Sequence, residues 1–218
     1  MELQGKKVLV FGSGKSGIGA SDLLAKVGAV PVIYDGNADI DKEAVVHKTN
    51  GTYPLEIYAG NLPEEVIDSL DLVVLSPGVP TDIPVVKNFY SKGIPVWGEV
   101  ELAFRVGAGE VLAITGTNGK TTTTALLGKI MQDARESVFV VGNIGTPYTS
   151  KALEMKPYSV TVAEISSFQL ETIDLFAPKV SAILNITEDH LNRHHTMEEY
   201  IRVKELITKN QGTEDICV

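Results

Sequence analysis

The segment at residues 110–131 constrains the fold of this chain more than any other. An apolar run at 110–114 leads into a glycine-rich turn, which is followed by a lysine–threonine pair and a helical pattern of leucine, isoleucine and methionine. In such a strand–turn–helix unit, main-chain N–H groups of the turn and of the helix N-terminus converge and favour an anion. The lysine adds a movable positive charge, and a threonine hydroxyl can bind Mg²⁺. The segment therefore predicts a phosphate-binding loop. Its residues are Gly116, Thr117, Asn118, Gly119, Lys120, Thr121 and Thr122.

This loop is shorter than the standard P-loop, which would place a glycine where Ile114 stands. The alternative interpretation is an ordinary strand–turn–helix unit whose glycines serve only the turn. We favour a nucleotide site because glycine, lysine and threonine all stand where nucleotide chemistry requires them.

A second glycine-rich turn lies near the start of the chain. The apolar strand expected at 7–11 leads into Gly12, Gly14 and Gly17 with the spacing G-x-G-x-x-G, and a helix and a second strand ending at Asp35 follow. This βαβ pattern predicts a diphosphate at the helix N-terminus. It does not identify the nucleotide. An NAD-dependent enzyme would hold a ribose at Asp35, and glycines that serve only helix–strand packing would show the same spacing.

The first half of the chain predicts a Rossmann-like α/β domain at residues 1–98. A buried strand at 71–75 ends in a turn that contains Ser76 and Gly78, and open α/β sheets bind ligands at the carboxyl ends of their strands. Apart from one short helix, the stretch at 36–70 is polar and irregular. The other expected elements are helices at 63–70 and 85–90 and a strand at 94–97.

The second half predicts a P-loop ATPase-type α/β domain at residues 99–218. Its apolar strands alternate with helical or loop segments, which indicates a mainly parallel sheet. The last residues, 215–218, resemble the first residues of a strand, so we expect this domain to be truncated here. The strands expected after the loop lie at 137–141, 160–165 and 180–186.

Side chains at these strand ends are candidates for a metal site. Mg²⁺ takes oxygen ligands and nucleotide phosphates, and Thr121 and Glu164 could both reach one ion. His190 follows two acidic residues in a strand-end loop and could be a further ligand. The alternatives are a Glu164 paired with a lysine and an ordinary loop histidine. The residues that their pattern places at the surface are Lys204, His194 and His195.

Composition narrows the choice of partners. The net charge of −9 argues against nucleic acid or an anionic membrane surface as the main partner. The single cysteine excludes a disulfide framework and fits a reducing cytoplasm. The first residues lack the apolar core of a signal peptide, and no apolar run is long enough to span a bilayer. We therefore expect a cytoplasmic protein.

Four motifs taken together resemble those of the Mur ligases and their relatives, the folylpolyglutamate synthetases. They are the shortened loop at 116–122, the turn at 142–145, and the runs at 164–170 and 187–191. The run at 164–170, with the glycine turn at 12–17, is most similar to the Mur ligases that add D-glutamate. The resemblance covers the whole chain.

By this resemblance, the first domain holds UDP rather than NAD, and the second holds ATP and Mg²⁺. Lys204 falls where the family carries a carbamylated lysine that binds Mg²⁺, which reverses its interpretation as a surface residue. Asn143 and His190 would face the second metal or the substrate carboxylate. The residues implied in catalysis are Lys120, His190 and Lys204, and the implied metal ligands are Thr121, Glu164, His190 and Lys204. Those implied in binding the UDP-linked substrate are Gly14, Lys15, Ser16, Gly17, Asp35, Ser76, Gly78, Asn143, Ser166 and Gln169.

The resemblance also implies a reaction. A monomer would join D-glutamate to UDP-N-acetylmuramoyl-L-alanine through an acyl phosphate, at the expense of ATP, in peptidoglycan precursor synthesis. We expect the family's amino-acid-binding domain to lie beyond residue 218, and the present chain to be inactive alone. The residues by themselves do not separate a kinase, an ATPase and a ligase. The alternatives are another Mur-type ligase, a folylpolyglutamate synthetase, a dinucleotide-dependent oxidoreductase and a nucleotide-binding module without catalysis.

Overall fold

The computed structural model describes residues 2–49, 53–143 and 145–218. The chain forms two compact units, Met1–Leu102 and Ala103–Val218. The division between the units falls within helix α5 (Glu99–Val106). The boundary expected after residue 98 lies just before this helix.

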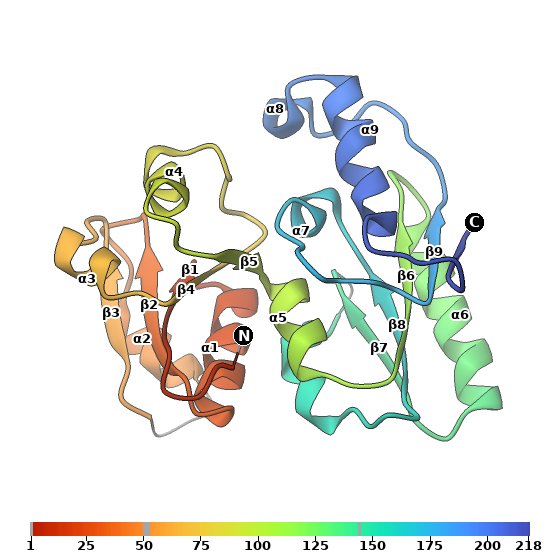
Figure 1. Cartoon of the computed structure of the whole chain (residues 1–218), viewed down its shortest axis with the longest axis horizontal. Coiled ribbons are helices and arrows are strands. Elements are labelled where there is room, and N and C mark those ends of the chain that lie inside the picture. The colour runs from red at the N-terminus through yellow and green to blue at the C-terminus, as the bar shows by residue number, and fades with distance from the viewer. Residues whose placement is uncertain (1, 50–52, 144) are drawn as a thin grey trace. The chain divides into compact units, whose positions relative to one another are not determined.

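Unit 1 is a parallel five-stranded sheet with helices between its strands (Figure 1). The strands lie in the order β3-β2-β1-β4-β5, so the chain begins in the middle of the sheet and builds outward on both sides. All four pairings are parallel, as expected for strands that alternate with helices. The strands are β1 (Lys7–Phe11), β2 (Val30–Asp35), β3 (Glu56–Ala59), β4 (Leu72–Leu75) and β5 (Val96–Gly98). The helices are α1 (Lys15–Lys26), α2 (Lys42–Lys48), α3 (Glu64–Asp68) and α4 (Pro84–Ser91).

Strand alternation builds the core of this unit. Leu9 and Phe11 of β1 lie in one apolar cluster with Val66 of α3 and Phe89 of α4. Because neighbouring strand residues point to opposite faces, the residues between them face the other way, where α1 packs against β1, β2 and β4.

Two elements of unit 1 lie in the stretch at 36–70 that the sequence pattern describes as irregular. Helix α2 begins at an Asp41 cap, whose side chain accepts a hydrogen bond from the Ala44 N–H, and buries only Val45. Strand β3 is a sheet edge, and its pairing with β2 in parallel register holds it there. The expectation that this stretch is irregular was therefore wrong for α2 and β3, which lack the continuous apolar pattern that would have predicted them. Residues 50–52 of the stretch are not among the described residues.

Unit 2 is also a parallel five-stranded sheet, as the alternating pattern predicts. Its order is β10-β9-β6-β8-β7, which places β6, the strand before the phosphate-binding loop, at the centre. The strands are β6 (Glu110–Thr115), β7 (Val138–Gly142), β8 (Val160–Glu164), β9 (Val180–Ile183) and β10 (Ile216–Cys217). The α-helices are α6 (Lys120–Ala134), α7 (Ser167–Leu170), α8 (Leu191–His194) and α9 (Met197–Glu205), and the 3-10 helices are η1 (Tyr148–Ser150), η2 (Ala152–Glu154) and η3 (Leu206–Thr208).

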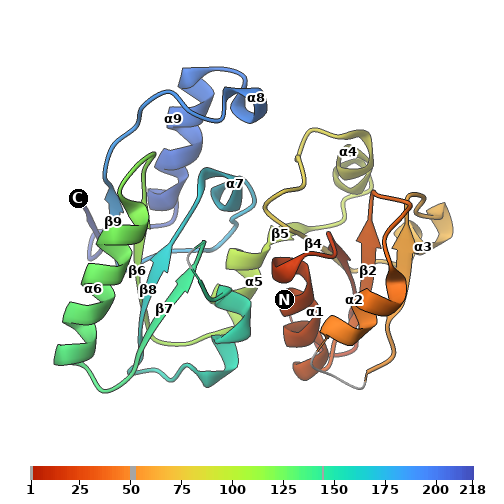
Figure 2. The same cartoon turned by 180° about the vertical axis from the view of Figure 1, so that it is seen from behind.

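Helix α6 packs along β6, β7 and β8, where Leu127 and Met131 join the cluster around Ile114 and Val162. Figure 2 shows α6 running beside this sheet, and Figures 1 and 2 both show α8 next to α9. Because all the strands are parallel, the ends of β6, β7, β8 and β9 reach the same edge of the sheet. Among the helices formed by the described residues, none has the length and apolar character that crossing a membrane would need.

Candidate nucleotide-binding site

Two glycines shape the phosphate-binding loop between β6 and α6. Gly116 has a φ of 146° and Gly119, the cap of α6, a φ of 83°. Residues other than glycine rarely adopt these φ values, so the turn itself requires both glycines. The loop ends where the fifteen-residue helix α6 begins, at Lys120. The N–H groups at the N-terminus of that helix therefore adjoin the loop.

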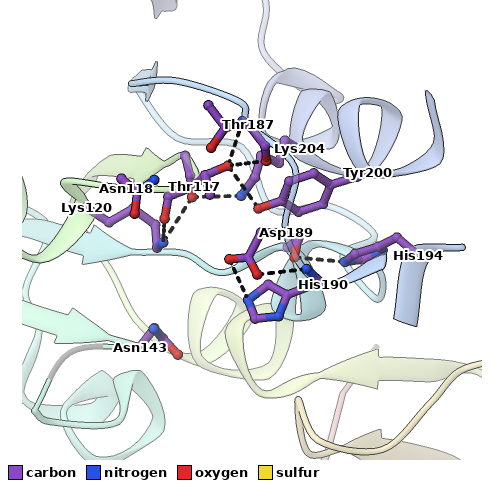
Figure 3. A network of polar contacts seen from close by, with 12 residues as sticks. Thr117, Asn118, Lys120, Asn143, Thr187, Asp189, His190, His194, Tyr200 and Lys204 are labelled. Atoms are coloured by element: carbon purple, nitrogen blue, oxygen red, sulfur yellow. Dashed lines mark hydrogen bonds and ion pairs between the residues drawn. The ribbon is translucent and has the colours of Figure 1, made fainter. Parts of the chain in front are cut away.

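Two lysine side chains reach the same carbonyl of this loop (Figure 3). Lys120 Nζ donates to the carbonyl oxygens of Gly116, at 3.0 Å, and Thr117, at 2.9 Å. Lys204 Nζ, from α9, donates to the same Gly116 oxygen at 2.8 Å. Two positive charges are thus held against one main-chain oxygen, which makes the loop a strongly positive place in a chain of negative net charge.

Lys204 is buried, with 1% of its surface exposed, so its interpretation from pattern as a solvent-exposed lysine was wrong. Its ammonium also lies 4.7 Å from the ring centroid of Tyr200, one helical turn earlier. Burial, assisted by the nearby charge of Lys120, lowers the pKa of Lys204 to about 8, although Asp189 acts in the opposite direction. The packing of α9 onto the loop, which a sequence pattern does not contain, is what buries this side chain.

Glu164, at the end of β8, lies with Thr121 and Asn143. Its Oε2 accepts from Thr121 Oγ1 at 2.8 Å, and its Oε1 accepts from Asn143 Nδ2 at 2.8 Å. The carboxylate is only 2% exposed and both donors are neutral. Burying a carboxylate without a cation is unfavourable, so this group of oxygen atoms fits a divalent cation such as Mg²⁺. The described residues contain no cluster of three or more histidine, cysteine, aspartate or glutamate side chains.

His190 is the residue before helix α8. Its Nε2 is 3.4 Å from Asp189 Oδ2, and its ring is tilted by 55° against that of Phe168, with centroids 4.9 Å apart. Its side chain is 48% exposed. Among residues 2–49, 53–143 and 145–218, no hydrogen bond or ion pair joins His190 to Glu164, and the role expected for His190 as a metal ligand stays a prediction.

His194 is buried, contrary to the surface position expected for it, whereas His195 is exposed as expected. The His194 ring lies between Phe168, at a centroid distance of 5.4 Å, and Tyr200, at 5.2 Å. Its Nε2 is 2.9 Å from Ser167 Oγ. These contacts fasten α8 to α7 and α9, and only the packing of three helices reveals them.

Ser166 and Gln169 form the cap of α7. The Ser166 hydroxyl accepts from the Gln169 N–H at 3.3 Å, and the Gln169 side-chain oxygen accepts from the Ser166 N–H at 2.8 Å. This reciprocal capping box stabilises a helix of only four residues. Both residues, predicted to bind substrate, therefore have a structural role as well.

In unit 1, the glycine turn is built by close packing. A Cβ atom on Gly17 would lie 1.9 Å from the Gly12 carbonyl oxygen, whereas one on Gly14 would meet nothing within 4 Å. Gly14 is the residue before α1, and the helix begins at Lys15 and Ser16 without a side-chain cap hydrogen bond. Gly17 thus serves packing, while Gly14 leaves open space where the helix N-terminus favours an anion.

Asp35 is engaged inside the same turn. Its Oδ2 accepts from the Ser13 N–H at 2.9 Å and the Ser13 hydroxyl at 2.6 Å, and its Oδ1 accepts from the Asn37 N–H at 3.0 Å. Burial alone would raise the pKa of Asp35, but these hydrogen bonds lower it below its ordinary value. Ser76 packs against Gly12 of this turn, and its buried hydroxyl has no hydrogen-bond partner among the described residues. A Cβ atom added at Gly78 would meet nothing within 4 Å.

Sequence reasoning missed several residues that hold the phosphate-binding loop. Asn185, just after β9, makes two side-chain hydrogen bonds to Asn118, and the Tyr200 hydroxyl lies 3.2 Å from Thr117 Oγ1. Thr187 contacts the same Thr117 hydroxyl. The sequence signal that could have found Asn185 and Thr187 was their position at a strand end, close to the candidate His190.

Each unit has a parallel sheet, and each has a glycine-containing turn before a helix, at α1 and at α6. These features define an α/β protein of the kind that binds phosphorylated ligands. Two family models match this chain: "Mur ligase MurD-like, N-terminal domain" over residues 6–98 and "Mur ligase middle domain" over residues 114–218. The chain belongs to the Mur ligase family.

Curated relatives align with this chain over its whole length. It is 58% identical to a UDP-N-acetylmuramoylalanine–D-glutamate ligase from Lachnoclostridium phytofermentans and 48% identical to one from Clostridioides difficile. In both comparisons, all of this chain aligns with 48% of the relative, so it spans about half the length of the curated relatives it matches.

Solved structures of the family share the fold. The Neisseria UDP-N-acetylmuramate:L-alanyl-gamma-D-glutamyl-meso-diaminopimelate ligase superposes with a TM-score of 0.56 at 16% identity, covering 98% of this chain and 71% of that one. The Thermotoga maritima UDP-N-acetylmuramate–alanine ligase gives 0.51 at 22% identity, covering 97% and 48%. At these identities the likeness concerns the fold alone.

Proposed function

We propose that this chain supplies the UDP-substrate unit and the ATP unit of a ligase that joins D-glutamate to UDP-N-acetylmuramoyl-L-alanine. Support comes from curated relatives of that name at 58% and 48% identity along the whole chain. The proposal places the reaction in the cytoplasm, in peptidoglycan precursor synthesis, and needs one copy of the chain.

The observation that carries the proposal is the convergence of Thr121, Asn143 and Glu164 beside Lys120 at the start of α6. A buried carboxylate whose donors, Thr121 and Asn143, are both neutral suits a Mg²⁺ ion. A helix N-terminus and a lysine suit the phosphates that such an ion accompanies. When bound, Mg²⁺ would neutralise phosphate charge, with Thr121 and Glu164 as its protein ligands.

In the first step, a carboxylate oxygen of the alanyl group attacks the γ-phosphorus of ATP. The bond from that phosphorus to the bridging oxygen breaks, ADP leaves, and an acyl phosphate forms. Lys120, which contacts main-chain carbonyls of its own loop at 2.9 and 3.0 Å, would turn to the phosphates and stabilise the charge that develops there.

In the second step, the amine of D-glutamate attacks the carbonyl carbon of the acyl phosphate. The tetrahedral intermediate loses inorganic phosphate and a proton, and the amide remains. We assign His190 and Lys204 to this side of the site, with Lys204 as a carbamate formed from its amine and CO₂ with loss of one proton. Ser166, Gln169 and Asn143 are assigned to the substrate.

Unit 1 is assigned to UDP, with the diphosphate at Gly14, Lys15, Ser16 and Gly17. The space around Gly14 at the start of α1 supports this assignment. Asp35 and the turn at Ser76 and Gly78 are placed around the uridine. The competing assignment to NAD would place a ribose at Asp35, whose two carboxylate oxygens accept hydrogen bonds from the chain in this structure.

The test of the reaction is ATP-dependent phosphate release by the protein at the length of its relatives. With UDP-N-acetylmuramoyl-L-alanine and a panel of amino acids, release should occur with D-glutamate and not with L-glutamate, glycine or L-lysine. Release with a different amino acid, or none with D-glutamate, would reject the assignment. Calorimetric titration of the present chain with UDP and with NAD separates the two assignments of unit 1.

A matched pair of lysines on α6 tests the role of the loop. Lys120→Ala should abolish phosphate release, because it removes the cation at the loop. Lys129→Ala changes a lysine whose side chain is 68% exposed and pairs with Asp133 one turn later, so activity should remain. Equal effects of the two substitutions would contradict the assignment of Lys120.

A further inference from the structure

The segment that follows β9 continues alongside the phosphate-binding loop after the sheet itself has ended. The Leu184 N–H donates to the Thr115 carbonyl at 3.1 Å, and the Thr117 N–H donates to the Asn185 carbonyl at 2.9 Å. Parallel main-chain pairing between β6 and β9 therefore extends into the loop. Beyond Thr117, no further main-chain hydrogen bond joins the two segments in the part of the chain that the structure describes.

A side chain takes over at this point. Asn185 Oδ1 accepts from the Asn118 N–H at 2.9 Å, and Asn185 Nδ2 donates to the Asn118 carbonyl at 3.0 Å. One carboxamide thus satisfies both main-chain groups of Asn118, as a neighbouring strand would do. A carboxamide is the neutral side-chain group that offers a donor and an acceptor with this spacing.

The held residue lies between Gly116 and Gly119. Both glycines have positive φ, and glycine gives the main chain more freedom than any other residue. Without an external contact, the short piece between them would sample many conformations. Asn118 is therefore the position where a fixed contact restricts the loop most.

A second contact fastens the neighbouring residue of the loop. Thr117 Oγ1 accepts from the Thr187 N–H at 3.0 Å and donates to the Thr187 carbonyl at 3.1 Å (Figure 3). The segment 184–187 thus holds two successive residues of the loop, and then leads directly to Asp189 and His190.

We propose that Asn185 is a positioning residue for nucleotide binding, which holds Asn118 so that the N–H groups at the start of α6 are already arranged for a polyphosphate. A preorganised loop loses less conformational freedom when the nucleotide arrives, and this raises its affinity. The proposal rests on the proposed function, since it assumes that the loop binds ATP and ADP.

The experiment measures ADP affinity of the present chain with Mg²⁺ by calorimetry. In Asn185→Ala, ADP should bind about tenfold more weakly, as expected for the loss of about two hydrogen bonds that order the loop. UDP affinity, which reports on unit 1, should stay within twofold. Amide hydrogen exchange at Asn118 should accelerate, because the Asn185 acceptor is gone.

Asn210→Ala is the matched control. Asn210 also uses its side-chain amide to bond main-chain carbonyls in unit 2, those of Asp174 at 2.7 Å and Phe176 at 3.0 Å. It touches no residue of the loop in these contacts. This control should lower the melting temperature and leave ADP affinity unchanged, which separates positioning from a general loss of stability.

The possible outcomes distinguish the two proposals. Failure of the unsubstituted chain to bind ADP would reject the nucleotide assignment itself. ADP binding that is within twofold in Asn185→Ala, or equally weakened in Asn210→Ala, would overturn the role of Asn185 alone. If Asn185→Ala does not fold, Asn185→Ser provides the same measurement, because its shorter hydroxyl cannot span both groups of Asn118.

Discussion

The buried His194 predicts a specific loss of stability in mild acid. Its side chain is 2% exposed and lies between Phe168 and Tyr200, with Ser167 Oγ at 2.9 Å from one ring nitrogen and Glu171 Oε1 at 3.5 Å from the other. Burial first, then the positive charges of neighbouring side chains, lowers the pKa of His194 from 6.5 to about 4. The folded chain therefore keeps this imidazole neutral where the unfolded chain protonates it.

The sign and size of the effect follow from this difference. About one pH unit above 6.5, His194 is essentially neutral in both states and contributes almost no pH dependence. As the pH falls from 6.5 towards 4, only the unfolded state takes up the proton, so the free energy of unfolding decreases. Linkage gives a loss of about 2 kcal/mol at pH 5 and about 3 kcal/mol at pH 4, relative to pH 7.5.

Urea unfolding of the chain at pH 7.5 and pH 5 measures this loss, with His194→Phe as the reference. The phenylalanine keeps an aromatic ring between Phe168 and Tyr200 but cannot titrate. It should be less stable at pH 7.5, by about 1–3 kcal/mol, because Ser167 loses its partner. Between the two pH values it should lose about 2 kcal/mol less than the unsubstituted chain. Parallel losses in the two proteins would refute the reasoning, and His194→Gln supplies the comparison if His194→Phe does not fold.

Glycine packing gives two further predictions. Gly17→Ala should destabilise the chain by about 3 kcal/mol, because its Cβ would lie 1.9 Å from the Gly12 carbonyl oxygen, whereas Gly14→Ala should change stability by less than about 0.5 kcal/mol in thermal unfolding. Gly128→Ala places a Cβ 2.4 Å from Val140 Cγ2 and should cost about 1–2 kcal/mol despite the better helix propensity of alanine. Adding Val140→Ala removes that atom, so the double variant should be more stable than the sum of the single effects, and strict additivity would contradict the steric explanation.

Much of the candidate site could be predicted because its chemistry is local. The two glycines and the lysine–threonine pair of the loop lie close together in sequence. Their pattern is typical of a strand–turn–helix unit that binds phosphate. The meeting of Glu164 with Asn143 could be anticipated because carboxyl ends of parallel strands share one edge of the sheet. The structure places these two side chains 2.8 Å apart.

Contacts that depend on helix packing could not be predicted in the same way. Lys204 and His194 stand in polar stretches, where charge and hydropathy indicate solvent exposure, yet they are 1% and 3% exposed. Their burial arises because His194 and α9 pack against α7, and because α9 reaches the loop through Lys204. Both α7 and the loop lie far from α9 in sequence. Strand β3 escaped prediction because an edge strand with few buried residues is held by its neighbour rather than by its own pattern.

The sequence by itself determined the two α/β units, the phosphate-binding loop and the strand-end position of Glu164, since each follows from short-range turn chemistry or from strand alternation. The tertiary structure decided which side chains hold that loop in place. Asn185 holds Asn118 because β9 lies beside β6 in the sheet, and Lys204 reaches Gly116 because α9 packs against the loop. Such contacts depend on the order of strands in the sheet and on the packing of helices, and those are set by the burial of the whole core rather than by any local motif.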